Sequence, residues 1–294
     1  VLFRSRAILG VGVGILGIKN ALIIKASPAS KSSAYLGYSA VCFNVVNSLA
    51  SPLVGALADK KWNYSFLIHL VAILVAILVI FFFKEPEEVK TTVSSEGKKK
   101  EKVKVDGQVY VIMAIIFLMT GTLYSFLTGM STYLTNKGIG NAAMAGTMLS
   151  LYTIGGAVGN LFLGKIHAKM IKKTLPLTAA LVVIGQAAVL YIPNIIVISI
   201  ACLIAGCGYM VGMYTCIKLS SSVSEPKSIA TATLFVQAAL QAGVFLHSYI
   251  IEIFHTVFRM STNVESAFLG TIVVYVVILI FTSLYKFRFY EKEA

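Results

Sequence analysis

Long apolar runs separated by short polar stretches make up most of the chain. Nine of the runs approach or exceed the length of about 20 residues that a helix needs to cross a bilayer core of ~30 Å. They are residues 7–24, 34–58, 64–83, 109–134, 143–166, 174–191, 195–218, 229–253 and 267–285. Open strands would leave backbone groups unpaired in lipid, so each run is expected to be a helix. The pattern therefore predicts an all-α polytopic membrane protein with nine transmembrane helices.

The composition agrees with a lipid-solvated chain, since 57% of its residues are hydrophobic and 13% are charged. A soluble domain of 294 residues could not bury that much apolar surface around one core. The net charge of +13 lies in short loops between apolar runs and not on one polar face, so we expect a lipid bilayer and not nucleic acid as partner. The four cysteines lie within apolar runs without disulfide or metal spacing, so we expect no metal and no cofactor.

If every run crosses the membrane, most of the basic residues between the runs lie on the same side of it. One side receives Lys25 and Lys31, the lysines of 84–104 and 165–173, Lys218, Lys227 and the basic residues of 286–292. The other side receives Lys60, Lys61, Lys137 and Arg259. The positive-inside rule places the richer side in the cytoplasm. We therefore expect a multi-pass protein of the cell membrane whose residues 84–107 and C-terminus are cytoplasmic.

Residues 84–107 are polar, mixed in charge and without periodicity, which is typical of a flexible linker. The linker separates a front part, 1–83 with three helices, from a back part, 108–294 with six. Transporters built from repeats have matched halves, so we expect three further helices ahead of residue 1. The opening VLFRS is also what the adapter-derived DNA GTGCTCTTCCGATCT encodes. We expect native sequence from about Arg6, and poor stability of a fragment confined to 1–294.

Glycines spaced four residues apart occur in three of the apolar runs. Two glycines at this spacing share one helix face and allow a neighbouring backbone to approach closely. The sequence therefore predicts tight helix packing at three pairs, which are Gly10 and Gly14, Gly155 and Gly159, and Gly208 and Gly212.

The stretch RAILGVGVG at residues 6–14 carries a family resemblance. It is similar to the fourth helix of the major facilitator superfamily, where an Arg stands three residues before a Gln-Gly pair. Arg6 and Gly10 match this pattern, while Leu9 stands where Gln is common. The resemblance implies that the nine helices correspond to helices four to twelve of a twelve-helix fold.

A second stretch, SPLVGALADKKWNYSF at 51–66, resembles the end of the fifth helix and the start of the sixth in that family. Pro52 and Gly55 match the Gly-Pro-x-x-Gly-Gly element of its proton-driven antiporters, although Ser51 and Ala56 replace flanking glycines. The resemblance implies roles in coupling or gating for Arg6, Pro52 and Gly55, with protons as the coupling ion.

The stretch GKIHAKMIKK, residues 164–173, resembles the family's loop between the eighth and ninth helices. Ala168 stands where the family has Asp, and Ile171 where it has Gly. The resemblance implies a cytoplasmic latch between the two halves, and the alternative is that the lysines only set orientation. The latch residues would be Gly164, Lys165, Lys169, Lys172 and Lys173.

Polar residues within the apolar runs are the candidates for a substrate cavity, because lipid makes them costly. Lys19 either reaches the interface or provides a cation in the cavity. Thr233, Gln237 and Gln241 are spaced four apart and share one helix face, which lines a cavity or bonds to another helix. Further candidates, in the runs 109–134 and 143–166, are Tyr124, Ser125, Thr128, Thr132, Tyr152 and Asn160.

These observations favour a secondary active transporter of a small organic solute. A proton-coupled drug or metabolite exporter that works as a monomer when full length is the specific expectation, and a uniporter or facilitator is the alternative. A membrane-embedded enzyme or a sensor is the alternative from another class. The loops carry neither a nucleophile pair nor a His/Asp/Glu cluster, so we expect no enzymatic activity.

Overall fold

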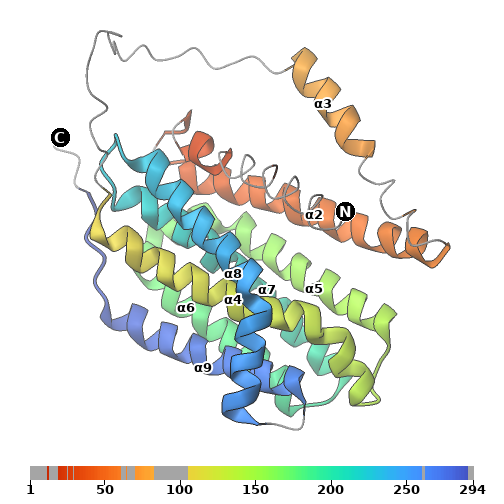
Figure 1. The fold of residues 1–294 in the computed structure, drawn as a ribbon. Helices are drawn as coiled ribbons and strands as arrows, with labels where there is room; N and C mark the ends of the chain where they lie inside the picture. The colour runs from red at the N-terminus through yellow and green to blue at the C-terminus, as the bar shows by residue number, and fades with distance from the viewer. Residues whose placement is uncertain are drawn as a thin grey trace.

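A computed structural model describes residues 12, 19–24, 26–28, 30–60, 64, 70–82, 105–259 and 262–290. Within these residues the chain is helical and contains no strand (Figure 1). A short helical stretch at 19–24 precedes the labelled helices. These are α2 (Ser32–Lys60), α3 (Leu70–Phe82), α4 (Gly107–Asn136), α5 (Ala142–Leu161), α6 (Leu163–Tyr191), α7 (Ile195–Ser222), α8 (Ile229–Phe258) and α9 (Asn263–Leu284).

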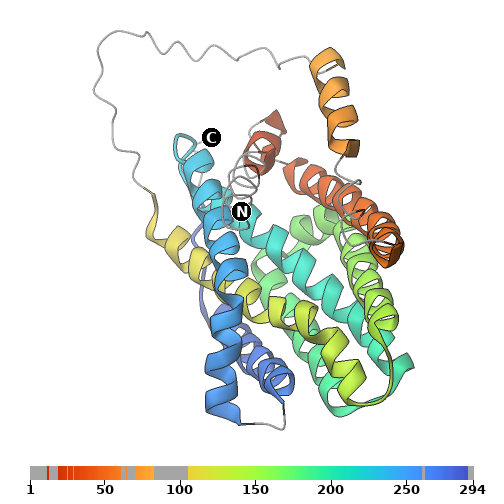
Figure 2. The ribbon, with the colours of Figure 1, turned by 45° about the vertical axis from the view of Figure 1, so that its right-hand side comes forward.

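Helices α4 to α9 form one bundle with α7 near its centre. Helix α7 packs against α5 and α6, α4 packs against α8, and α9 covers α4 and α6. Helix α2 lies on the side opposite α9, against α5 and α6, whereas α3 stands apart from the other described helices (Figures 1 and 2). Helix α2 is therefore one part of the front of the chain that packs on the bundle.

Side chains just ahead of several helices fix where those helices begin. Asn141 accepts a hydrogen bond from the Met144 amide at 3.0 Å, and Asn194 accepts one from the Ile196 amide at 2.9 Å. Such caps pair backbone amides that have no partner within the helix. Asn194 also explains why three residues suffice between α6 and α7, and the predicted start of an apolar run at residue 195 agrees with the structure.

Five of the helices are long and apolar enough to cross a membrane: α4, α6, α7, α8 and residues 264–284 of α9. They correspond to five of the nine predicted runs. The thirteen described residues of α3 are fewer than a crossing needs, and most of the first run, 7–24, lies outside the described residues. Helix α4 begins at Gly107, the last residue of the predicted linker, whose residues 84–104 also lie outside the described part.

The stretch 164–173, expected as a loop, is helical on both sides of a break at Met170. Helix α6 begins at Leu163, directly after α5, and consists of two helical pieces that meet at Met170, where the backbone is not helical (φ −151°, ψ 38°). Lysine, alanine and isoleucine all tolerate a helix. The sequence between Lys165 and Lys173 contains no Gly or Pro that would stop it. The four lysines here are exposed on this helix and not on a loop.

Close packing at the glycines is confirmed where the structure describes it. A Cβ added to Gly155 would lie 2.0 Å from the Leu203 carbonyl oxygen, and one added to Gly206 would lie 1.9 Å from the Tyr152 carbonyl oxygen. Gly159, Gly208 and Gly212 also leave no room for a Cβ, whereas Gly10 and Gly14 lie outside the described residues. Helix α7 is therefore held against its neighbours at backbone contact distance.

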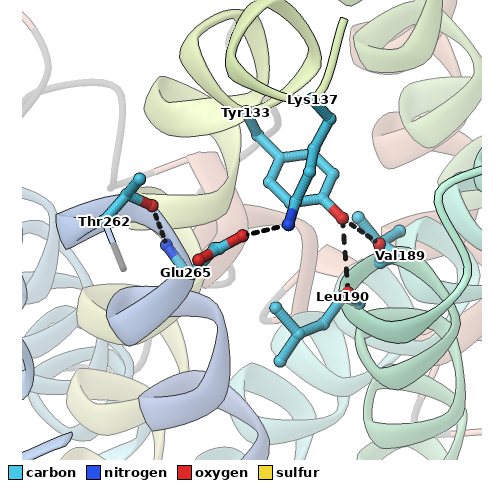
Figure 3. Close-up of polar contacts among 6 residues, drawn as sticks. All are labelled: Tyr133, Lys137, Val189, Leu190, Thr262 and Glu265. Atoms are coloured by element: carbon cyan, nitrogen blue, oxygen red, sulfur yellow. Dashed lines mark hydrogen bonds and ion pairs between the residues drawn. The ribbon is translucent and has the colours of Figure 1, made fainter. Parts of the chain in front are cut away.

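Polar contacts fasten the end of the bundle where α4 meets α6 and α9 (Figure 3). The buried Tyr133 hydroxyl donates to the Val189 carbonyl at 2.7 Å. The Lys137 ammonium forms an ion pair with Glu265 at 2.5 Å and lies 5.9 Å from the centre of the Tyr133 ring. At the opposite end, Lys218 of α7 donates to Ser32 of α2 at 2.7 Å. Contacts at both ends thus fix the relative positions of distant segments.

Candidate functional site

The described helices surround a cavity of about 630 Å³. Its wall takes side chains from residues 19–20 and from α2, α4, α5, α7 and α8. Tyr124, Tyr152, Tyr209 and Gln241 come from near the middle of their respective helices. Cavities of about 300–1,000 Å³ between helices are the usual place for small-molecule sites. The cavity therefore has the size and depth of a solute-binding site within a membrane.

Lys19 is the only charged residue among the described residues of the cavity wall. Its ammonium lies 5.6 Å from the centre of the Phe43 ring of α2, at a distance suited to a cation–π contact. No carboxylate in the described ranges forms an ion pair with it. Of the two roles considered for Lys19, its place in the wall favours the cavity cation.

Amide and hydroxyl groups add neutral polarity to the wall. Asn20 donates to Gln237 at 3.5 Å, which joins the start of the chain to α8. The side-chain oxygen Oδ1 of Asn20 and the Tyr152 hydroxyl are buried without a hydrogen-bond partner in the described part of the chain. Leaving such a group unpaired costs about 1–3 kcal/mol. These two atoms are therefore available to a polar group of a bound solute.

The structure brings together five of the ten cavity candidates. Lys19, Tyr124, Tyr152, Gln237 and Gln241 all line the cavity.

The other five candidates lie outside the wall, and three of them bond to backbone carbonyls of their own helix. Ser125 donates to the Thr122 carbonyl, Thr128 to Tyr124 at 2.9 Å and Thr233 to Ile229 at 2.8 Å. A hydroxyl three or four residues after a carbonyl commonly bonds in this way. Thr132 is exposed, and Asn160 is buried near the contact of α5 with Gly37 of α2.

Several residues of the wall were missed by the sequence reasoning, and the largest group of them lies on α7. Met210, Met213, Tyr214 and Ile217 follow the spacing of one helix face. From Ile200 to Tyr214, helix α7 carries only apolar residues, glycines and tyrosines, so this face has no polar stripe that would distinguish it. The two methionines beside a tyrosine were the available signal, because methionine is frequent in adaptable binding surfaces.

The coupling and latch candidates lie away from the cavity or outside the described part. Arg6 is not among the described residues, and only the backbone of α2 is described at Pro52 and Gly55. Gly164 faces α2, since a Cβ added there would come within 2.8 Å of the Ala34 Cβ. Lys172 lies 5.0 Å from the Phe289 ring, and it is exposed, as are Lys165, Lys169 and Lys173.

The chemistry of the cavity wall suits the binding of an organic solute. Across the described ranges, no three residues of His, Cys, Asp and Glu come together as metal ligands would. The wall contains amides, phenols, one amine and apolar side chains. Such groups recognise an organic solute by shape, hydrogen bonds and charge.

Membrane-length helices around a cavity at mid-depth define the class as a polytopic helical membrane protein with an internal cavity. The family model of the Major Facilitator Superfamily matches residues 1–248, and the chain belongs to this family. The resemblance noted in the sequence is thereby confirmed, and the chain is a multi-pass membrane transporter of the major facilitator type. A comparison with curated proteins finds no match.

Proposed function

We propose that this transporter moves a small organic solute across the cell membrane by alternating access through the cavity. The observation that carries the proposal is the shared wall. Residues 19–20 and α2 of the front part line it together with α4, α5, α7 and α8 of the back part. A site built from two parts of the chain opens to either side when those parts tilt against each other.

Contacts at the end that we assign to the cytoplasm support the same mechanism. There, α2 touches α5 and α6 so closely that a Cβ on Gly37 would lie 2.3 Å from the Asn160 carbonyl oxygen. Lys218 bonds to Ser32 at the same end. We infer that these contacts close the cytoplasmic side in this state and separate when the cavity opens inward. Gly164, against Ala34, is part of this closure, and the nearby lysines provide its latch.

Coupling to protons rests on the partial antiporter element at Pro52 and Gly55. One observation favours the facilitator as the second candidate, because the described residues of the wall include no Asp or Glu to carry a proton. In both cases we propose a monomer, with linker and C-terminus in the cytoplasm.

Transport in membrane vesicles tests the proposal. Vesicles from cells that produce the gene product containing these residues are loaded with a panel of labelled organic anions, cations and neutral solutes, with and without a pH gradient. We expect flux of at least one solute, and Gln241→Trp, which places a bulky indole in the middle of the cavity, should strongly reduce it. The matched control is Phe245→Trp on the same helix, because Phe245 is 77% exposed and lies outside the wall.

Three outcomes separate the alternatives. Flux that collapses with a protonophore supports the coupled exporter, and flux down its own gradient that ignores the protonophore supports the facilitator. Equal flux in Gln241→Trp and Phe245→Trp would contradict a route through this cavity.

A further inference from the structure

The cavity contains one positive charge that no described carboxylate balances. Lys19 lies in the wall, and its ammonium contacts the face of the Phe43 ring. Among the described residues, Lys137 and Glu265 form an ion pair, but they lie at the far end of the bundle. An isolated cation within the membrane is costly and is generally paired when it is functional. The missing partner is therefore expected to be an anion that enters the cavity.

Two buried neutral groups in the same wall also have no hydrogen-bond partner in the described part of the chain. The Asn20 carbonyl oxygen and the Tyr152 hydroxyl are unpaired, and their residues are 6% and 1% exposed. Asn20 is adjacent to Lys19 in sequence and is bonded to Gln237. The Tyr152 hydroxyl can donate to an anionic oxygen, and Asn20 can accept from a hydroxyl of the solute. The unpaired atoms thus support polar recognition in the same wall as Lys19.

The remainder of the wall is apolar and aromatic. Leu127, Leu149, Met210, Met213, Leu240 and Val244 line it together with the tyrosine rings. A small inorganic anion would leave most of this surface unused in a cavity of about 630 Å³. An apolar body of roughly ten to twenty heavy atoms fits both the size and the lining.

We propose that the cavity selects an amphipathic organic anion, with its carboxylate at Lys19 and its apolar body among the aromatic and methionine side chains. This assignment rests on the proposed function and names the substrate class for the same site. The anion provides the charge that Lys19 lacks, and the flexible methionines accommodate bodies of different shape.

Binding to the purified gene product tests the assignment without requiring transport. The probes are benzoate, 4-hydroxybenzoate, phenylpyruvate and octanoate, each compared with its uncharged amide, and benzylamine serves as the cationic control. Thermal stabilisation and titration calorimetry measure binding. We expect at least one carboxylate to bind at least tenfold more tightly than its amide, because a charge-assisted hydrogen bond is lost with the charge.

Variants at Lys19 assign the selectivity to this residue. Lys19→Gln should weaken the carboxylate at least tenfold and leave its amide unchanged, and Lys19→Arg should restore most of the difference. Lys227→Gln removes an equal charge from an exposed turn outside the wall, so it should bind as the unaltered protein does.

Each remaining result counts against the inference. Equal affinity for carboxylate and amide, tighter binding of benzylamine, no binding by any probe, or an unchanged preference in Lys19→Gln would overturn it. Flux of a cation or a neutral solute in the vesicle assay would overturn it while leaving the proposed function intact. Carboxylate binding without flux of any solute would support the site and contradict the transport proposal.

Discussion

Replacing Gly206 with alanine tests how closely α5 and α7 approach. The new Cβ would lie 1.9 Å from the Tyr152 carbonyl oxygen, and ordinary contact begins near 3.4 Å. The two helices would therefore have to separate by roughly 1.5 Å. The reciprocal contact of Gly155 with the Leu203 carbonyl, where a Cβ would lie at 2.0 Å, keeps the helices equally close about one turn away in the same interface.

The cost of this separation is expected at the upper end of the range for overpacking, about 3 kcal/mol. Both obstructing atoms belong to the backbone, so no side-chain rotation relieves the contact. For a chain of this size, we expect a fall in Tm of roughly 6–10 °C. Thermal unfolding in detergent, followed by the fraction that remains monodisperse, measures the change.

The matched control is Gly146→Ala in α5. Gly146 also lies within a helix, but nothing stands within 4 Å of an added Cβ. Alanine has the higher helix propensity, so Tm should stay unchanged or rise slightly. If Gly206→Ala and Gly146→Ala unfold at the same temperature, the backbone contact between α5 and α7 does not exist, and the argument for tight packing on glycine fails.

Three further changes probe polar groups of the bundle. Tyr133→Phe removes the hydroxyl that donates to Val189 and should lower the unfolding free energy by about 1 kcal/mol, measured as a lower Tm. The hydrogen bond to Glu265 raises the pKa of Lys137 above its ordinary value of 10.5. The stabilisation it gives, less than about 1 kcal/mol because the Lys137 side chain is 38% exposed even though Glu265 is buried, is present below pH 10.5 and lost as pH rises through the higher folded pKa. Gln186→Leu should leave Tm unchanged or raise it, because this buried amide has no hydrogen-bond partner in the described part of the chain.

Each of these changes has a control. Tyr110→Phe removes a hydroxyl from a side chain that is 55% exposed, and an equal loss of Tm there would contradict the role given to Tyr133. As the pH rises from 10 to 12, the Tm of Lys137→Gln should fall by less than the Tm of the unaltered protein. An equal fall in both proteins would exclude the ion pair as the cause of the pH dependence. A loss of several degrees in Gln186→Leu would mean that its amide is paired in the folded protein.

Helix starts were predictable where their cause is local. Asn194 follows Pro193 and caps α7, so the predicted start at residue 195 agrees with the structure. The start of α6 was misplaced because hydropathy treats lysine as a sign of a loop. Lys165 and Lys169 keep their charges exposed while their backbone is helical, so a charge run does not separate a loop from an interfacial helix.

The candidate site was predictable to the extent that period reveals a helix face. The four-residue spacing correctly grouped Gln237 and Gln241, and both line the cavity. The same spacing included Thr233, whose short hydroxyl bonds to the carbonyl of Ile229. The length of a side chain therefore matters as well as its spacing along the helix. A glutamine amide extends beyond the backbone of its own helix, whereas a threonine hydroxyl stays close enough to bond to it.

What the sequence alone could not supply is which faces meet. Asn20 and Gln237 are 217 positions apart, yet they bond across the wall of the cavity. The spacing of residues along a helix shows which face each of them occupies, but it does not show which other helix packs against that face. Lys19 is an example. From the sequence alone, a lysine near a helix end is equally well explained as a side chain that extends to water or as a cation that faces a solute. Its contact with Phe43, which belongs to a different helix, favours the second reading.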